Sequence, residues 1–189
     1  WFTRGKLGSG LSENGDTLRH KPMNALLLLS CSAAEETGSC GPSLSYSFDS
    51  SLGILKISGT GAMEDYSPKS CAPWYQFRER IKCLELDEGF YSIGSYAFYE
   101  CTGLSSVTIP DSVVRIPKCA FCSCTGLTTA TFGKGVATLE FDLFYRCSRI
   151  SCVGVNSNFV LANLRYILKE ACIERVELGG DVTRIKNEE

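Results

Sequence analysis

Histidine, surplus positive charge and long apolar runs are all scarce in this 189-residue chain. The single histidine, His20, lies near the start, so a Ser–His or Cys–His nucleophile pair would need a residue from outside the patterned region. Lysine and arginine number 19 against 21 acidic residues, a net charge of −2, which provides no basic stripe for nucleic acid. The sequence has no run of about 18 apolar residues, so it predicts no membrane-spanning segment.

The motifs of common enzyme and cofactor sites are also missing. No Gly-x-Ser-x-Gly nucleophile elbow occurs. Gly59-Thr-Gly61 lacks the third glycine of a dinucleotide-binding loop and the Gly-Lys-Ser/Thr ending of a phosphate loop, so we interpret it as a structural turn. The acidic pair Asp87-Glu88 precedes Gly89 at the end of a predicted strand, where solvated turn charges are typical. We therefore expect neither enzyme activity nor a cofactor.

What the chain does contain is a repeat of 23 residues that runs from Ile81 to Ile150. Seven columns of apolar or thiol residues recur at that spacing through three copies. A period of this length indicates a repeat solenoid, in which each copy buries its apolar face against the next. The columns are Leu84, Val107 and Ala130; Leu86, Ile109 and Phe132; Phe90, Val113 and Val136; Ile93, Ile116 and Leu139; Phe98, Phe121 and Phe144; Cys101, Cys124 and Cys147; and Leu104, Leu127 and Ile150.

Each copy contains a strand signal and an aromatic position. The Leu-x-x-Val-x-Ile segment has the alternation of a short strand, so stacked copies predict a parallel sheet with strands about 4.8 Å apart. The column formed by Phe98, Phe121 and Phe144 is expected to stack into an aromatic spine on the opposite side of the repeat.

Residues 1–39 differ from the rest and are interpreted as a leader, either disordered or a degraded signal-like segment. Basic residues around His20, an apolar patch and a small-x-small site follow one another, which is the layout of an export signal. Leu28-Leu-Ser-Cys31 also resembles a lipid-anchor motif. A plain buried apolar segment is the third interpretation.

Residues 40–80 are predicted to form an N-terminal cap. Apolar residues alternate with serines over 44–48 and alternate again over 55–57 after a turn-rich gap, which predicts a β-hairpin. An aromatic-rich loop containing Trp74 follows. Because the first copy of a solenoid has an apolar end that needs an atypical cover, this hairpin and loop are assigned to that role.

The repeats are assigned to residues 81–189, clear over 81–149 and degenerate over 150–189. In the fourth copy the isoleucine, phenylalanine and cysteine columns hold Ala162, Ile167 and Glu170, so the stretch 159–172 also fits a short helix. The column residues that remain in the last two copies are Val153, Val155, Phe159, Val176, Leu178, Val182 and Ile185.

These motifs resemble the BspA-like leucine-rich repeat family. The matching elements are Pro-Trp-Tyr at 73–75, Ala-Phe-x-x-Cys-x-x-Leu at 97–104 and Ile-Pro-x-x-Val-x-x-Ile at 109–116. The resemblance covers residues 40–150 well and 150–189 weakly, and Pro117 stands where the family usually has glycine. It implies a surface-exposed or secreted repeat protein of bacteria or of parasitic or commensal protists, linked to adhesion and host binding.

Alternation along the predicted strands leaves two rows of residues facing outward, and solenoids bind partners on such surfaces. The rows are Cys83, Ser106, Thr129, Cys152 and Arg175, and Glu85, Thr108, Thr131, Gly154 and Glu177. The rows are small and polar and lack aromatic anchors, so a solvated face is the alternative, and we expect modest affinity per copy, raised by multivalency. From the rows we select as candidate binding residues Glu85, Ser106, Thr108, Thr129 and Thr131.

Eleven cysteines are many for this length, and the number is odd. The core column of Cys101, Cys124 and Cys147 is expected to pack as small apolar side chains, with a disulfide between adjacent copies as the alternative. Cys40 and Cys71 both fall in the cap, where a disulfide staple is the corresponding alternative to free thiols.

One cysteine cluster has metal-like spacing, Cys119-x-x-Cys122-x-Cys124. A structural zinc site usually takes a second pair of ligands, and none follows here. Cys124 also belongs to the inward column. We therefore expect no metal site.

Together these observations predict a leucine-rich repeat solenoid, with short parallel strands stacked in a curved array, turns or short helical segments on the opposite side, and an N-terminal β-hairpin cap. We expect a non-enzymatic protein, secreted or on the cell surface, that binds a protein or a cell-surface macromolecule. Two alternatives stay open: an intracellular, cytoplasmic repeat scaffold, and the accessory repeat region of a larger surface hydrolase, since the chain has the character of a fragment.

Overall fold

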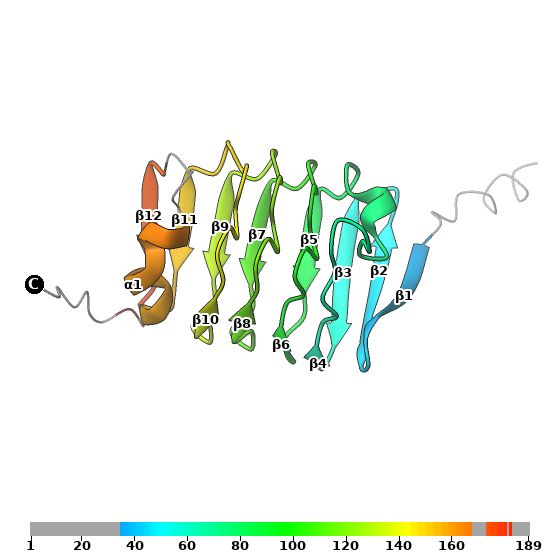
Figure 1. Ribbon diagram of the computed structural model, residues 1–189, viewed down its shortest axis with the longest axis horizontal. Coiled ribbons are helices and arrows are strands. Elements are labelled where there is room, and N and C mark those ends of the chain that lie inside the picture. The colour runs from blue at the N-terminus through cyan, green and yellow to red at the C-terminus, as the bar shows by residue number, and fades with distance from the viewer. Residues whose placement is uncertain (1–34, 168–172, 181, 183–189) are drawn as a thin grey trace, which may run out of the picture. The chain divides into compact units, whose positions relative to one another are not determined.

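The computed structural model describes residues 35–167, 173–180 and 182 (Figure 1). The export-signal and lipid-anchor interpretations of the leader fall on residues 1–34, which lie outside the described residues, as do Glu170 and Ile185. Strand β1 (Glu35–Gly41) takes in residues that the predicted boundary assigns to the leader.

The first strands are antiparallel. β1 pairs with β2 (Leu44–Asp49), and β2 pairs with β3 (Ile54–Gly59). The Asp49 carboxylate closes the connecting turn by accepting hydrogen bonds from the backbone N–H groups of Ser51 at 2.8 Å and Leu52 at 3.1 Å. β2 and β3 are thus the antiparallel pair that the alternation predicts.

The longer strands of the repeats pair in parallel. Val107 pairs with Ala130 and Ile109 with Phe132, so the 23-residue columns of the sequence are neighbours in the ladder. β3 pairs with the first repeat strand, β5, and β5 lies beside β7 (Figure 1), although no ladder pair joins β5 to β7 within the described residues. The strands are β5 (Cys83–Leu86), β7 (Ser106–Ile109), β9 (Thr129–Phe132), β11 (Cys152–Val155) and β12 (Arg175–Leu178).

A second set of short strands forms another parallel ladder, in the order β10-β8-β6-β4. Each of the first three repeats therefore contributes one longer strand and one short strand, and most of the column residues are buried. The short strands are β4 (Gly61–Ala62), β6 (Phe90–Ser92), β8 (Arg115–Ile116) and β10 (Thr138–Leu139).

The aromatic spine is confirmed. The rings of Phe98 and Phe121 stack with centroids 5.0 Å apart, and those of Phe121 and Phe144 lie 6.0 Å apart. Upstream, the buried ring of Trp74 extends the stack, 5.7 Å from Phe98, and its Nε1–H donates to the backbone oxygen of Ala97 at 2.8 Å. Trp74 immediately precedes the 3₁₀ helix η1 (Tyr75–Phe77).

The chain turns on either side of each spine phenylalanine, and several residues of these turns have backbone angles in the left-handed region. Non-glycine residues rarely adopt positive φ, yet here they recur at two fixed positions of the repeat. The first position precedes the Ala-Phe pair or its counterpart, and the second lies two residues beyond the spine phenylalanine. These residues are Tyr96, Cys119 and Asp142, and Glu100, Ser123 and Arg146.

Acidic side chains link successive repeats at the turn between the longer strand and the short strand of each repeat. The Glu88 carboxylate accepts hydrogen bonds from the backbone N–H groups of Asp111 at 3.1 Å and Ser112 at 2.9 Å. One repeat later, Asp111 accepts from the backbone N–H of Lys134 at 3.0 Å. The N–H donors lower the pKa of both carboxyl groups, led at Glu88 by Ser112 and at Asp111 by Lys134. Glu88 is exposed, as expected of a turn charge, but it also joins two repeats.

The fourth copy contains the helix that the degenerate pattern allows, α1 (Asn158–Ile167). Ser157 caps it, since its Oγ accepts from the backbone N–H of Val160 and donates to the backbone oxygen of Val136 at 2.8 Å. The helical turn corrects one column assignment. Val160 is fully buried, whereas Phe159, predicted to face inward, is 38% exposed.

The fifth copy also departs from the prediction. Val176 and Leu178 were expected to face inward, but they are 39% and 53% exposed on β12. β12 pairs with β11 on one side, and within the described residues no strand pairs with its other side. The column residues therefore have the correct alternation, but no strand among the described residues covers their second side.

Candidate binding surfaces

Four of the five predicted binding residues lie together on the neighbouring strands β7 and β9. Ser106 and Thr108 of β7 pair with Thr129 and Thr131 of β9. Ser106 and Thr108 are exposed, whereas Thr129 and Thr131 are half-buried. We call this group, together with Glu85, the sheet face.

Glu85 stands apart from these four in the ladder. It is exposed on β5, but its ladder partner is Lys56 of β3. Beyond β9, strand β11 adds little to the sheet face, because Cys152 is buried and Gly154 has no side chain. An added Cβ on Gly154 would lie 2.9 Å from the side chain of Thr131. The sheet face is therefore shallow, with hydroxyl groups as its main donors.

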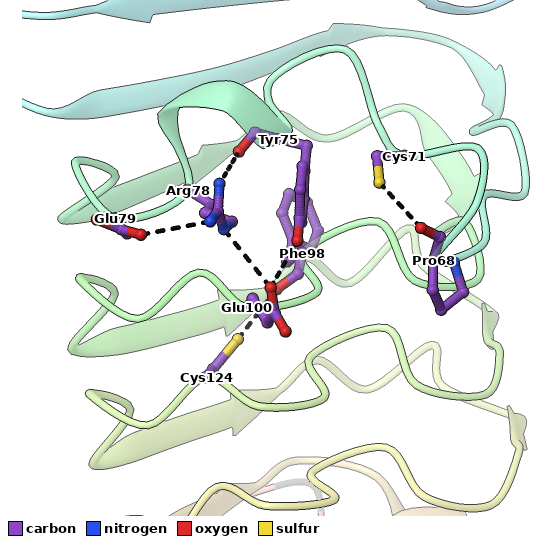
Figure 2. A network of polar contacts seen from close by, with 8 residues as sticks. All are labelled: Pro68, Cys71, Tyr75, Arg78, Glu79, Phe98, Glu100 and Cys124. Atoms are coloured by element: carbon purple, nitrogen blue, oxygen red, sulfur yellow. Dashed lines mark hydrogen bonds and ion pairs between the residues drawn. The ribbon is translucent and has the colours of Figure 1, made fainter.

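A second surface, which the sequence analysis did not select, lies on the turns around the spine (Figure 2). The Tyr75 hydroxyl donates to Glu100 Oε2 at 2.5 Å, and Arg78 Nε lies 3.6 Å from the same oxygen. The Arg78 guanidinium also lies over the Tyr75 ring, 4.4 Å from its centroid, and contacts Glu79 at 3.3 Å. These contacts fix an aromatic ring and a cation at the surface.

More tyrosines continue this surface along the repeats. The Tyr99 ring is parallel to that of Tyr75, with centroids 6.3 Å apart, and Tyr96 packs edge-on against Tyr99 at 5.8 Å. The Arg146 guanidinium lies over the Tyr145 ring at 5.2 Å. We define the tyrosine ledge by its aromatic and cationic members: Tyr75, Arg78, Tyr96, Tyr99, Tyr145 and Arg146.

The ledge is an electrostatic unit. The hydrogen bond to Glu100 raises the pKa of Tyr75 to about 12, and the same bond lowers the pKa of Glu100. The hydrogen bond to Glu100 also raises the pKa of Tyr99. The positive charge of Arg146 acts in the opposite direction, so Arg146 is close enough to Tyr99 to interact with it electrostatically. Near neutral pH Tyr75 and Tyr99 are thus protonated beside the Glu100 carboxylate.

A sequence signal for the ledge does exist. Tyr75, Tyr99 and Tyr145 each follow the spine aromatic, Trp74, Phe98 or Phe144. The corresponding residue of the second copy is Cys122, which interrupts the series. The columns consist of apolar residues that point inward, so they do not include the outward-pointing tyrosine that follows each spine aromatic.

The core cysteines are packed as free thiols. Cys101, Cys124 and Cys147 are buried, and the last two donate their S–H to the backbone oxygens of Phe98 and Phe121, each at 3.0 Å. This confirms the packing interpretation, and the inter-repeat disulfide alternative is not realised.

The disulfide staple in the cap is not formed either. Cys40 is buried and free, and Cys71 is exposed, with its thiol donating to the backbone oxygen of Pro68 at 3.6 Å. The two thiols differ in burial because Cys40 lies in the core beside β2, whereas Cys71 belongs to the surface loop shown in Figure 2.

Two further findings bear on function. In the part of the chain that the structure describes, no three or more histidine, cysteine, aspartate or glutamate side chains gather in a way that would hold a metal ion. Among the same residues, no helix combines the length and apolar character needed to cross a bilayer. His20 lies outside the described residues.

Comparisons with known proteins complete the picture. No curated protein matches the chain. Among solved structures, it is similar to a leucine-rich repeat protein from Eubacterium ventriosum, with a TM-score of 0.57 and 24% sequence identity. The match covers 79% of this chain and 45% of that one, so the chain spans less than half of its structural neighbour. The family model of the BspA type leucine-rich repeat region matches residues 74–188 in six copies. The chain therefore belongs to the BspA-type leucine-rich repeat family.

Proposed function

We propose that this chain is a non-enzymatic surface or secreted protein that binds other proteins, in adhesion to cells or to a host, and that the tyrosine ledge carries its main contacts. Membership of the BspA-type family supports a protein-binding role. The observation that carries the proposal is the ordered row of tyrosine and arginine side chains on the turns.

The composition of the ledge favours a binding role. Tyrosine and arginine are enriched at the residues that dominate protein–protein binding energy, whereas threonine and serine are under-represented there. Tyr145 is 38% exposed, and Tyr75 and Tyr99 are half-buried, so each ring offers a face or an edge to a partner while the rest of it is packed. Stacking and hydrogen bonds already restrict these side chains, which lowers the entropy lost on binding.

The sheet face is proposed as a secondary contact. Glu85, Ser106, Thr108, Thr129 and Thr131 provide hydroxyl and carboxylate groups without a large apolar side chain. Such a surface supplies hydrogen bonds at the rim of an interface and little affinity on its own. Substitutions in the tyrosine ledge are therefore expected to weaken binding more than substitutions in the sheet face.

Two matched variants separate the surfaces. The ledge variant combines Tyr145→Ala with Arg146→Gly, because Arg146 has a φ of +62°, which glycine adopts without strain. The sheet variant combines Ser106→Ala with Thr108→Ala. Binding of the labelled chain to intact epithelial cells should fall about tenfold or more for the ledge variant and less than about threefold for the sheet variant.

The controls test the kind of partner. Trypsin treatment of the cells should abolish binding if the partner is a surface protein, and the melting temperatures of both variants should match the wild type. A larger loss in the sheet variant would reverse the roles of the two surfaces. Binding that survives trypsin would contradict a protein partner.

The proposal includes the domain organisation. We infer that the β-hairpin and loop of 40–80 cap a solenoid whose repeats occupy 81–189, after a leader in 1–39. Support comes from β3, which pairs with β5 as a preceding repeat would and buries Leu55 and Ile57. Introducing a charge with Leu55→Asp should unfold the first repeats, detected by loss of circular dichroism at room temperature.

A second candidate, an intracellular repeat scaffold, is favoured by one observation. The nine cysteines of the described residues are free, a state typical of reducing compartments. The intact mass of the protein from its native host, before and after reduction and alkylation, separates the two candidates. A processed N-terminus with disulfides supports export, and a complete chain with reduced thiols supports the scaffold.

A further inference from the structure

The turn that interrupts the tyrosine ledge brings two cysteines together. Cys119 has a φ of +54°, and the backbone N–H of Cys122 donates to the backbone oxygen of Cys119 at 3.2 Å. This hydrogen bond closes a four-residue turn, whose first and last Cα atoms lie within about 7 Å. Disulfides join Cα atoms in about this range, so the backbone needs little rearrangement to link the pair.

The two thiols also interact. Interaction with Cys119 adds to the effect of burial in raising the pKa of the Cys122 thiol. Cys122 donates its S–H to the backbone oxygen of Asp142, in the next repeat, at 2.9 Å. Interaction with Cys119 also raises the pKa of Tyr96, in the preceding repeat. The pair thus lies between a ledge tyrosine and the turn of the next repeat.

Access distinguishes this pair from the other thiols. Cys119 is half-buried, whereas Cys122 is 1% exposed and burial raises the pKa of its thiol. Cys124 and Cys147 also interact, but both lie in the core, and each donates its S–H to a backbone oxygen. Within the described residues, Cys119 and Cys122 therefore combine proximity in one turn with partial exposure of one of the two cysteines.

We propose that Cys119 and Cys122 form a reversible redox site, in which an external low-molecular-weight disulfide oxidises the pair to an intramolecular disulfide. The thiolate of Cys119 attacks one sulfur of the external disulfide, releases one thiolate and leaves a mixed disulfide on Cys119. Cys122 then gives up its proton, and its sulfur attacks Cys119 Sγ and expels the second thiolate. Two protein thiols become one disulfide, and the external disulfide becomes two thiols after taking up the two protons.

Oxidation has a consequence for the ledge. A disulfide has no S–H, so Cys122 can no longer donate to the backbone oxygen of Asp142 in the next repeat. Asp142 precedes the turn that carries Tyr145 and Arg146, and Tyr96 belongs to the preceding repeat. The redox state of the pair therefore alters the contacts between the two halves of the tyrosine ledge.

The test uses the full chain equilibrated in buffers of reduced and oxidised glutathione, followed by acid quenching, alkylation and peptide mass mapping. We expect a disulfide between Cys119 and Cys122 to form at a high ratio of reduced to oxidised glutathione, because its closure is intramolecular. At the same ratio the exposed Cys71 and Cys83 should carry no stable mixed disulfide with glutathione. Dithiothreitol should restore both thiols.

Two variants and a second reagent sharpen the result. Forming the disulfide lowers the mass of the peptide by two hydrogen atoms. Cys119→Ser should abolish this mass change at the same glutathione ratio, whereas Cys83→Ser, which removes an exposed cysteine of β5, should leave it unchanged. Phenylarsine oxide, which bridges two neighbouring thiols with loss of water, should bind the reduced wild type at Cys119 and Cys122 and fail to bind after oxidation. The wild-type map requires no variant to fold. Mixed disulfides on Cys119 with no bridge to Cys122, or a disulfide mapped to another pair, would overturn the proposal.

Discussion

Leu55 and Ile57 of β3, at the N-terminal end of the parallel strands, are fully buried, whereas Val176 and Leu178 of β12, at the other end, are largely exposed. All four residues alternate along a strand in the same way. The N-terminal pair is covered by the antiparallel strands and by aromatic side chains, whereas the C-terminal pair has a neighbouring strand on one side in the part of the chain that the structure describes. In a repeat array a column residue is buried only when a unit packs on each of its two sides.

The two ends also differ in what fixes them. At the N-terminal end, aromatic rings pack into the core: Tyr46 lies edge-on to Trp74 at 5.3 Å, and Phe48 stacks on Phe77 at 4.7 Å. At the C-terminal end, Ser157 caps helix α1 of the fourth repeat and joins it to the backbone oxygen of Val136. We therefore expect substitutions at the N-terminal end to destabilise the protein more than equivalent changes at the C-terminal end.

The largest effect is expected for Trp74→Ala. The substitution removes a fully buried ring from the spine and the hydrogen bond to the Ala97 oxygen. We predict a loss of about 3–5 kcal/mol in the free energy of unfolding, measured by urea denaturation. Tyr91→Ala, which removes an aromatic ring that is mostly exposed on β6, is the control and should change stability little. Similar losses in the two variants would contradict the role assigned to Trp74.

The Tyr75–Glu100 hydrogen bond predicts how the N-terminal end responds to pH. The pKa of Tyr75 is raised to about 12 in the folded chain, so its contribution to stability is complete below about pH 10 and is lost as the pH rises through about 12. The pKa of Glu100 is lowered, so its contribution is present above its ordinary value and is lost as the pH falls.

Glu100→Gln removes the charged partner from both equilibria. We expect melting temperatures recorded from acid to alkaline pH to vary less steeply at both extremes in this variant than in the wild type. The matched control is Glu79→Gln, which removes the other carboxylate that contacts Arg78 but no tyrosine partner. Its alkaline limb should follow the wild type. An unchanged alkaline limb in Glu100→Gln would show that the hydrogen bond does not contribute.

A smaller effect is expected at the C-terminal end for Ser157→Ala. The substitution removes the cap of α1 and the hydrogen bond to the Val136 oxygen. Loss of an N-cap serine typically costs about 1 kcal/mol, and chemical denaturation should detect it. Ser148→Ala, at an exposed turn position, is the control. If the two variants were equally stable, the capping role of Ser157 would be wrong.

The sequence was sufficient to predict most of the fold, because the columns report which residues face inward. The 23-residue spacing became the ladder register, and the phenylalanine column became the spine. The columns do not indicate whether a further repeat packs against the last one. The pattern therefore predicts that Val176 and Leu178 are buried, although they are exposed. Phe159 failed for a different reason, since the helix that begins after Ser157 turns Val160 inward in its place.

The candidate surface was harder to predict than the fold. Outward rows on strands follow from alternation alone, so the residues of the sheet face were accessible to sequence reasoning. The tyrosine ledge depends on turns in which Tyr96, Glu100 and Arg146 adopt positive φ, a conformation that residue type does not indicate for these side chains. The spacing of the tyrosines that follow the spine was the available signal.

The smallest expected effect, that of Val176→Thr, tests the comparison of the two ends most directly when it is set beside Val153→Thr. Val153 and Val176 occupy the same column and are ladder partners on β11 and β12, but Val153 is fully buried and Val176 is 39% exposed. Threonine has almost the shape of valine and adds a hydroxyl, so Val153→Thr buries a polar group and should cost about 1–3 kcal/mol. Val176→Thr leaves its hydroxyl in contact with water and should change the free energy of unfolding by less than about 0.5 kcal/mol. Equal losses by urea denaturation would show that β12 is covered in solution, and the contrast between the two ends would then be wrong.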